Sequence, residues 1–223
     1  MNTNTNTKVA IVLSGVIFLV VIAFIIVAIM QAQPSSPKAD GNPAIATASA
    51  IADDTHILDD AGKGAVTVVE FLDFECEACG AFYPVVEDLR EEFSGQVTFA
   101  FRYFPLPGHF NSTNAAVAVE AAAQQGQLEP MYQRMFETQA EWGEAQESRA
   151  PLFRQFAEEL GLDLAEYDAA VADPATAERV QSDFDAGVAL GVSSTPTFFV
   201  NDQMVQMKSF DDLGAAIQAE LDR

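Results

Sequence analysis

The first hydrophobic feature of the chain is an apolar run from residue 9 to residue 30 that is interrupted only by Ser14. At about 1.5 Å per residue, a helix of this length spans roughly 33 Å, which is enough to cross the hydrocarbon core of a bilayer. The run exceeds the roughly 7–15 apolar residues of a secretory signal peptide. We therefore predict an uncleaved single-pass transmembrane helix, with a cleaved signal peptide as the alternative. Residues 1–8 are polar and end in Lys8, which favours a cytoplasmic N-terminus and an extracytoplasmic domain.

The pattern changes twice after this run. Residues 31–54 are rich in Pro, Ser, Ala and Gly without hydrophobic periodicity, and we predict a flexible linker there. From residue 55 onward the chain has the patterning of a folded domain. Residues 66–74, VTVVEFLDF, are apolar on both alternating faces, which is typical of a central strand buried on both sides. A helix over residues 81–93 and a second strand over residues 96–104 follow.

The rest of the domain is helical before it returns to strands. Apolar residues at spacings of three and four predict five helices, over residues 112–125, 130–139, 149–160, 164–171 and 175–190. The chain then predicts a hairpin and a last helix, with strands over residues 197–200 and 204–207 and a helix over residues 209–221 that starts at Ser209. The order is βαβ, a helical insertion, and ββα, which indicates an α/β domain.

The charge of the chain excludes some partners. It carries 11 Lys and Arg against 33 Asp and Glu, a formal net charge of -22. Such a surface repels nucleic acids and anionic lipid headgroups, so we expect neither as a partner. The acidity is explained by solubility or by a salty environment, and steering of basic substrates is the alternative.

The chain has 2 cysteines, and they form the motif Cys76-Glu77-Ala78-Cys79. A structural zinc site needs about four protein ligands, and the two histidines lie far apart in sequence, so no metal site is expected. The motif lies instead where a predicted strand meets a helix. Unpaired N–H groups and the positive dipole end of the helix stabilise a thiolate there. We therefore predict a redox dithiol in which Cys76 is the nucleophile and Cys79 the resolving thiol.

Two further features accompany the dithiol. Glu70 lies in the middle of the predicted central strand, where burial would raise its pKa and allow it to exchange a proton with the resolving thiol. An exposed acid at a strand edge is the alternative. Thr195-Pro196 precedes a strand, and a cis proline at that position would expose the backbone of Thr195 to an extended substrate.

Three segments together resemble the DsbA-like branch of the thioredoxin superfamily, in its membrane-anchored bacterial form. They are VTVVEFLDFECEAC at residues 66–79, FRYFPLPGHFNS at residues 101–112, and GVSSTPTFFVN at residues 191–201. The resemblance covers residues 55–223. It implies a thioredoxin-like fold with a helical insertion at about residues 111–190.

The resemblance also implies the roles of the site residues. Cys76 would attack, Cys79 would resolve, Glu70 would be the buried acid, and Thr195-Pro196 would form the cis-proline loop. It implies an enzyme with no cofactor beyond the redox-active disulfide. The expected protein is a monomer that exchanges disulfides with thiol-bearing exported proteins outside the cytoplasm.

The sequence departs from the strongly oxidising relatives in the dipeptide between the cysteines. Those proteins have Cys-Pro-His-Cys, whereas this chain has Glu77-Ala78 with Glu75 just before the motif. Because glutamates oppose a nearby thiolate, we expect a Cys76 pKa above, and a reduction potential below, those of such relatives. We favour an oxidase re-oxidised by a membrane redox partner, for which a quinone-linked protein is a candidate.

Three other functions stay open at this point. They are a thioredoxin-like reductase, a tethered binding or chaperone module with a structural disulfide, and a metallochaperone for a soft cation such as Cu(I). We assign no role to His56 or His109. Asp73 is interpreted either as a solvent-exposed residue at a strand end or as an acid that supports the site, and Trp142 as a core residue.

Overall fold

The computed structural model describes residues 49–223 of the chain. The predicted transmembrane helix at residues 9–30 and most of the predicted linker lie outside this part. Among the residues that the structure describes, no helix is both long and apolar enough to cross a membrane.

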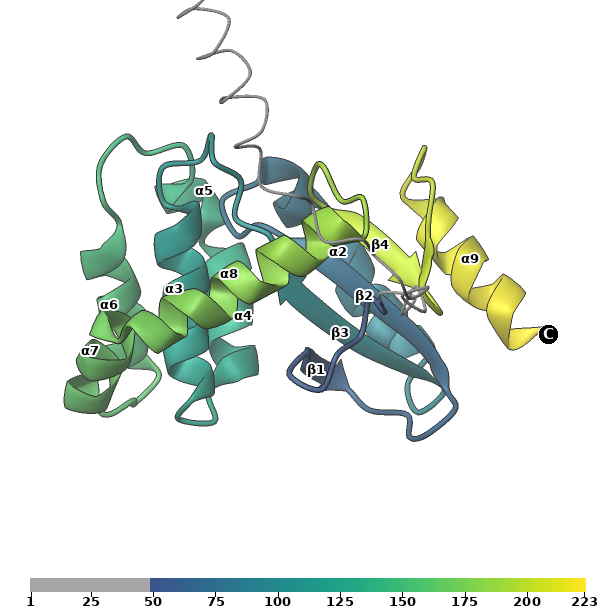
Figure 1. The fold of residues 1–223 in the computed structure, drawn as a ribbon, viewed down its shortest axis with the longest axis horizontal. Helices are drawn as coiled ribbons and strands as arrows, with labels where there is room; N and C mark the ends of the chain where they lie inside the picture. Colours follow the sequence, from purple (N-terminus) through teal and green to yellow (C-terminus); the bar gives the residue numbers. More distant parts are fainter. Residues whose placement is uncertain (1–48) are drawn as a thin grey trace, which may run out of the picture. The chain divides into compact units, whose positions relative to one another are not determined.

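The centre of the domain is a mixed sheet of five strands (Figure 1). The strands are β1 (His56–Asp59), β2 (Val66–Leu72), β3 (Val97–Tyr103), β4 (Thr197–Val200) and β5 (Gln203–Met204). Their order across the sheet is β1-β3-β2-β4-β5, and β2 and β3 run parallel while the other neighbours are antiparallel. β2 therefore lies between two strands, as its apolar pattern on both faces predicts.

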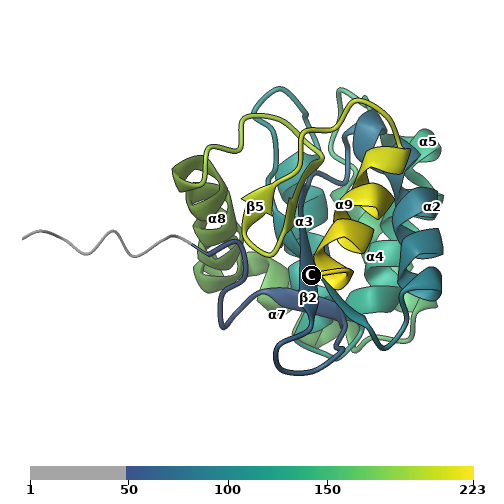
Figure 2. The same ribbon diagram turned by 90° about the vertical axis from the view of Figure 1, so that its right-hand side faces the viewer.

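Helices cover both faces of this sheet. α2 (Glu77–Glu92) and α9 (Asp211–Leu221) lie on one face, and α8 (Pro174–Ala189) lies on the other, as Figure 2 shows. Alternate residues of β2 point to the two sides, with Val68 in the core under α2 and α9 and Phe71 in the core on the opposite face. The architecture is the thioredoxin-like α/β fold that the resemblance predicts.

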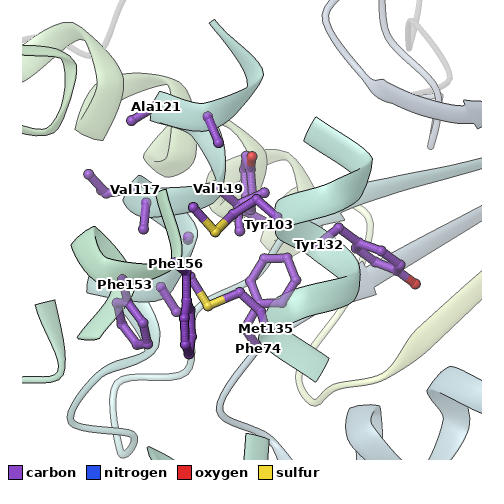
Figure 3. Packing of buried hydrophobic residues seen from close by; sticks show 14 of the residues in the cluster. Phe74, Tyr103, Val117, Val119, Ala121, Tyr132, Met135, Phe153 and Phe156 are labelled. Carbon is purple, nitrogen blue, oxygen red and sulfur yellow. The ribbon is translucent and has the colours of Figure 1, made fainter. Parts of the chain in front are cut away.

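A helical insertion separates β3 from β4. Its helices before α8 are α3 (Ser112–Ala123), α4 (Leu128–Glu137), α5 (Gln139–Trp142), α6 (Ala150–Glu159) and α7 (Leu164–Ala172). They enclose the largest apolar cluster of the domain (Figure 3). Phe74, two residues after the end of β2, packs into this cluster, where its ring is tilted against that of Phe136 with centroids 5.0 Å apart. The insertion therefore supports the loop that leads into the cysteine motif.

The helix after the cysteine motif begins earlier than the sequence predicts. It starts at Glu77 rather than at residue 81, and Cys76 is its N-cap residue with φ −72° and ψ 120°. Pro84 is consequently inside the helix rather than in its first turns. Proline has no N–H to donate to the carbonyl four residues earlier, so the apolar packing of this helix outweighs a local propensity against it.

Three smaller expectations at the ends of the domain are wrong. β1 was not predicted, because its four residues are only half-buried and carry no clear alternation. The strand predicted over residues 204–207 is shorter and ends at Met204. The last helix begins at Asp211 rather than after Ser209, because the Asp212 carboxylate accepts the backbone N–H groups of Lys208 and Ser209 and holds them in a turn.

The packed domain also extends further toward the N-terminus than residue 55. The backbone N–H of Ala50 donates to Asp202 Oδ1 over 2.7 Å, and Ala50 is buried in the core beside Phe71. Asn201 and Asp202 form the tight turn between β4 and β5, with φ of 47° and 63°. The residues just before the expected domain boundary are therefore held by a turn close to the other end of the chain.

Candidate active site

The cysteine motif lies where β2 meets the first turn of α2. Cys76 is 7% exposed, and its backbone N–H donates to the carbonyl of Asp73 over 3.1 Å. Cys79 is fully buried one turn further along the helix, and its sulfur accepts the backbone N–H of Asp73 over 3.5 Å. Both residues are free thiols in this structure. Cys76 is therefore the more accessible sulfur of the pair.

The two thiols have opposite electrostatic environments. A hydrogen bond from the Cys79 thiol lowers the pKa of Cys76 to about 6, against the opposing effect of burial. Hydrogen bonds from Thr195 and from the backbone N–H groups of Cys79 and Ala78 act in the same direction. Burial raises the pKa of Cys79 well above its ordinary value. At neutral pH the reduced pair therefore holds a thiolate at Cys76 and a thiol at Cys79.

Glu70 lies beneath this pair on the central strand. It is 5% exposed, and its backbone pairs with Phe101 of β3 on one side and Phe198 of β4 on the other. Burial raises the pKa of Glu70 to about 8, and the negative charges of Cys76 and Glu87 add to the shift. The alternative of an exposed acid at a strand edge is wrong, because β2 is an interior strand.

The loop before β4 closes the site from the other side. The Thr195-Pro196 peptide bond is cis. The Cys76 thiol donates to the backbone carbonyl of Thr195 over 3.4 Å. The Thr195 hydroxyl is buried and has no hydrogen-bond partner within the described part of the chain. It is therefore free to donate to the Cys76 thiolate, and such a hydrogen bond lowers the Cys76 pKa.

Asp73 holds two loops of the site together. Its carboxylate accepts the backbone N–H of Glu75 over 2.9 Å and that of Leu106 over 3.0 Å, and it lies 2.6 Å from Nδ1 of His109. Asp73 is 2% exposed, so the interpretation of a solvent-exposed strand end is wrong. Burial opposes the charged form of His109, but the hydrogen bond to Asp73 outweighs it and raises the His109 pKa. The pair joins the cysteine loop to the loop before α3.

A second support comes from the insertion and carries no signal in the sequence. The side-chain amide of Gln139, in α5, donates to the carbonyls of Phe74 and Cys76 over 2.8 and 2.9 Å. A Cβ on Gly80 would lie 2.1 Å from the Gln139 side chain, so a glycine is required there for Gln139 to reach the loop. Neither residue was singled out from the sequence.

His56 belongs to a different part of the molecule. Its Nε2 lies 2.6 Å from the Glu120 carboxylate on α3 and 3.2 Å from the Tyr103 hydroxyl. These contacts join β1 and β3 to the insertion. Within residues 49–223, no group of three or more His, Cys, Asp or Glu side chains is arranged to hold a metal ion.

The curated sequence relatives match only one part of their own length. The chain is 40% identical over 140 residues to the Na(+)/H(+) antiporter NhaA 3 of Salinispora tropica, which covers 62% of this chain and 20% of that protein. It is 38% identical over 135 residues to the Na(+)/H(+) antiporter NhaA of Herminiimonas arsenicoxydans, again over 20% of that protein and 60% of this chain. The chain thus spans about a fifth of the length of these relatives, and their antiport activity is not transferred to it.

Solved structures share the fold over most of the chain. BdbD from Bacillus subtilis aligns with a TM-score of 0.66 and 24% identity, over 76% of this chain and 94% of that chain. A thioredoxin-like oxidoreductase from Silicibacter pomeroyi aligns with a TM-score of 0.66 and 24% identity, over 82% and 99%. The oxidoreductase DsbA from Xylella fastidiosa aligns with a TM-score of 0.61 and 19% identity, over 76% and 93%. At these identities the likeness establishes the fold.

The sequence also matches the model of a protein family. The model, described as Thioredoxin, matches residues 60–219. The matched region runs from just before β2 into α9, and it includes the cysteine motif, Glu70 and the cis-proline loop. The sheet order, the parallel β2–β3 pair and the motif at the N-terminus of α2 agree with that match. The chain therefore belongs to the thioredoxin family.

Proposed function

We propose that this protein is a thiol–disulfide oxidoreductase that donates the Cys76–Cys79 disulfide to thiol-bearing exported proteins. The observation that carries the proposal is the asymmetry of the pair. Cys76 lies at the helix N-terminus with a pKa lowered to about 6, while Cys79 is buried with a raised pKa. In a dithiol of this kind, the sulfur of lower pKa is a good leaving group when a substrate thiolate opens the mixed disulfide. The resolving thiol is buried and so shielded from substrates.

The reaction transfers two electrons from the substrate to the protein. A substrate thiolate attacks Sγ of Cys76 in the oxidised protein, an S–S bond forms between them, and the bond to Cys79 breaks. A second substrate thiolate then attacks the substrate sulfur of this mixed disulfide, and Cys76 leaves as a thiolate. The substrate gains a disulfide and releases two protons, of which Cys79 takes one, while Cys76 remains a thiolate at neutral pH.

Glu70 is the proposed proton donor to Cys79. The charge of Glu70 contributes to the raised pKa of Cys79, and the charge of Cys76 contributes to that of Glu70, so these groups interact directly. With a pKa of about 8, Glu70 carries a proton at neutral pH and can give it to the Cys79 thiolate as the disulfide opens. The proton is later regained from solvent.

The loop of Thr195 and Pro196 is the proposed binding surface for the substrate backbone. The Thr195 carbonyl lies 3.4 Å from the Cys76 sulfur, so a substrate bonded to that sulfur must pass this loop. An extended substrate segment can form main-chain hydrogen bonds there, as peptides do when they add to the edge of a sheet.

The reduced protein must pass its two electrons to an oxidant to complete a cycle. We propose a membrane redox partner, for which a quinone-linked protein has suitable chemistry, and an extracytoplasmic domain tethered through residues 9–30. The support for this location is the apolar run itself together with Lys8 just before it, which favours a cytoplasmic N-terminus. A thioredoxin-like reductase is the alternative direction for the same site.

The equilibrium reduction potential of the Cys76–Cys79 pair tests the direction. The full chain, kept in a nonionic detergent because of its apolar segment, is titrated against glutathione redox buffers. A potential between about −120 and −200 mV is expected for a disulfide donor, and a value near −270 mV, as in thioredoxin, would assign a reductase instead. Cys76→Ala serves as the control: retained activity in a thiol-oxidation assay would exclude the enzyme and leave a binding module.

A further inference from the structure

A small acidic cavity adjoins the cysteine motif. Its volume is about 150 Å³, and its lining includes the side chains of Glu75, Glu77, His109, Phe110 and Glu144. Glu77 directly follows Cys76 in the first turn of α2, so the cavity opens within one residue of the reactive sulfur. We refer to these five residues as the acidic pocket. The exchange reaction proposed above does not use it.

The acidic pocket has an excess of negative charge. The carboxyl groups of Glu77 and Glu144 share a hydrogen bond, which lowers the pKa of Glu77 and raises that of Glu144. The raised pKa of His109 favours its charged form, but its Nδ1 lies 2.6 Å from the buried Asp73 and is occupied there. Three glutamate side chains, two of which share one proton, therefore line a cavity whose nearby imidazole is already paired with Asp73.

Glu75 provides an independent sign that a donor belongs in this cavity. The residue is 2% exposed, and its Oε2 accepts the backbone N–H of Asn111 over 2.5 Å. Its Oε1 is buried and has no hydrogen-bond partner within the part of the chain that the structure describes. A buried carboxylate oxygen without a donor is costly, and a cationic donor in the acidic pocket would reduce that cost.

Phe110 completes the chemistry of the acidic pocket. It is 52% exposed, although large aromatic side chains are usually buried, and it forms part of the cavity wall. An aromatic face beside carboxylates suits a cation carried on an apolar stem, because the ring attracts the charge and packs against the methylene groups. Arginine and lysine side chains have both parts.

We propose that the acidic pocket binds the arginine or lysine side chain of a substrate at a position close in sequence to its reacting cysteine. This inference rests on the thiol–disulfide exchange proposed above and names the substrate class that reacts fastest. Consecutive Cα atoms are about 3.8 Å apart, so a pocket that begins beside Cys76 selects a cation within about three residues of the substrate thiol.

The test must separate this pocket from general attraction to an acidic protein. Two dithiol peptides of identical composition are compared, one with arginine two residues before the first cysteine and one with the same arginine at the far end of a Gly–Ser tail. Their net charges are equal, so long-range steering by the acidic domain affects both. A nearby arginine also lowers the pKa of the peptide's own cysteine and so speeds its reaction with any disulfide. To remove this effect, both peptides are also oxidised with hydroxyethyl disulfide, and the rate ratio obtained with the protein is divided by the rate ratio obtained with that small disulfide.

The expected corrected ratio for the oxidised full-length protein is about fivefold at low salt, the combined effect of partly exposed ion pairs and a cation–π contact. Glu144→Gln and Phe110→Ala should each lower the ratio to about twofold or less. The matched control is Glu91→Gln, which removes an exposed carboxylate at the other end of α2 and should leave the ratio unchanged. Trp142 fluorescence verifies that each variant is folded.

Two results would overturn the proposal: a wild-type ratio near one, or an unchanged ratio in both Glu144→Gln and Phe110→Ala. Oxidation of dithiothreitol, which is uncharged and has no side chain for the pocket, is measured in parallel. If the wild type oxidises dithiothreitol but shows no preference between the peptides, the pocket inference fails while the proposed function stands. If dithiothreitol is not oxidised, the proposed function itself fails.

Discussion

Replacing the buried acid with its isosteric amide, Glu70→Gln, should stabilise the reduced protein by an amount that grows with pH. The folded protein holds the Glu70 proton up to a pKa of about 8, whereas the unfolded chain releases it near the ordinary glutamate pKa of 4.5. Because the pKa of Glu70 is higher in the folded protein, its contribution to the free energy of unfolding is fully present below pH 4.5. That contribution is lost as the pH rises through the folded pKa.

The magnitude follows from the size of the shift. Each pH unit between the two pKa values lowers the free energy of unfolding of the wild type by about 1.4 kcal/mol. At about pH 7 the wild type has lost roughly 3 kcal/mol relative to acidic solution, whereas the glutamine variant has no such loss. Glu70 is 5% exposed, so screening by solvent reduces this value little.

Urea unfolding of the reduced protein measures the effect, with the fluorescence of Trp142, the one tryptophan of the chain, as the probe. The difference in unfolding free energy between Glu70→Gln and the wild type should rise steadily from about pH 4.5 to about pH 7.5. Glu91→Gln, which removes an exposed carboxylate, should show no such rise. A pH-independent difference for Glu70→Gln would mean that Glu70 ionises alike in the folded and unfolded states, and the argument for a buried neutral acid would be refuted.

Three further substitutions test the packing and the hydrogen bonds of the site. Thr195→Val should raise the Cys76 pKa by roughly one unit, because the thiolate loses a hydroxyl donor; ultraviolet absorbance of the thiolate follows the titration, and an unchanged pKa would remove that donor from the account. Asp73→Ala should lower the free energy of unfolding by about 2–4 kcal/mol, because it leaves buried N–H groups unpaired; a loss below 1 kcal/mol would show that water replaces the carboxylate. Gly187→Ala should cost about 1–3 kcal/mol in urea unfolding, because its Cβ would lie 2.7 Å from the Phe104 ring, and a neutral effect would contradict the tight contact of α8 with the sheet.

The sequence was most informative where a residue's neighbours along the chain decide its environment. β2 is apolar on both faces, so its position in the sheet interior and the burial of Glu70 could be predicted from residues 66–72 alone. The cysteine motif begins four residues after the end of that strand, so its location at a helix N-terminus could be predicted as well. Glu77 was expected to oppose the Cys76 thiolate, yet the thiolate is set mainly by hydrogen bonds from Cys79, Thr195 and the backbone.

The supports of the site could not be predicted because they depend on contacts between distant segments. Gln139 reaches the cysteine loop from α5, and its sequence neighbourhood does not distinguish it from an exposed polar residue. Asp73 was left undecided because its burial comes from the loop that carries Leu106 and His109. The adjacent FPLPGH segment was a usable signal, since a histidine in a proline-rich loop before a helix has few local partners and must find a distant one.

The lowered pKa of Cys76 bears on the direction of the reaction. At neutral pH, ionisation of a thiol of pKa about 6 stabilises the reduced form by about 1.4 kcal/mol, which corresponds to about 30 mV. For DsbA, whose nucleophilic cysteine has a pKa of about 3.5, ionisation of that thiol raises the reduction potential by about 100 mV. The DsbA reduction potential is about −120 mV, so a dithiol that differs from it only in this weaker thiolate would have a reduction potential of roughly −190 mV. Structural disulfides of exported proteins have reduction potentials below about −300 mV, which is lower than this value. Electrons would therefore still flow from the substrate thiols to the Cys76–Cys79 disulfide. A Cys76 thiolate of this strength would give a weaker oxidant than DsbA without reversing the direction of exchange, which is why we favour disulfide donation.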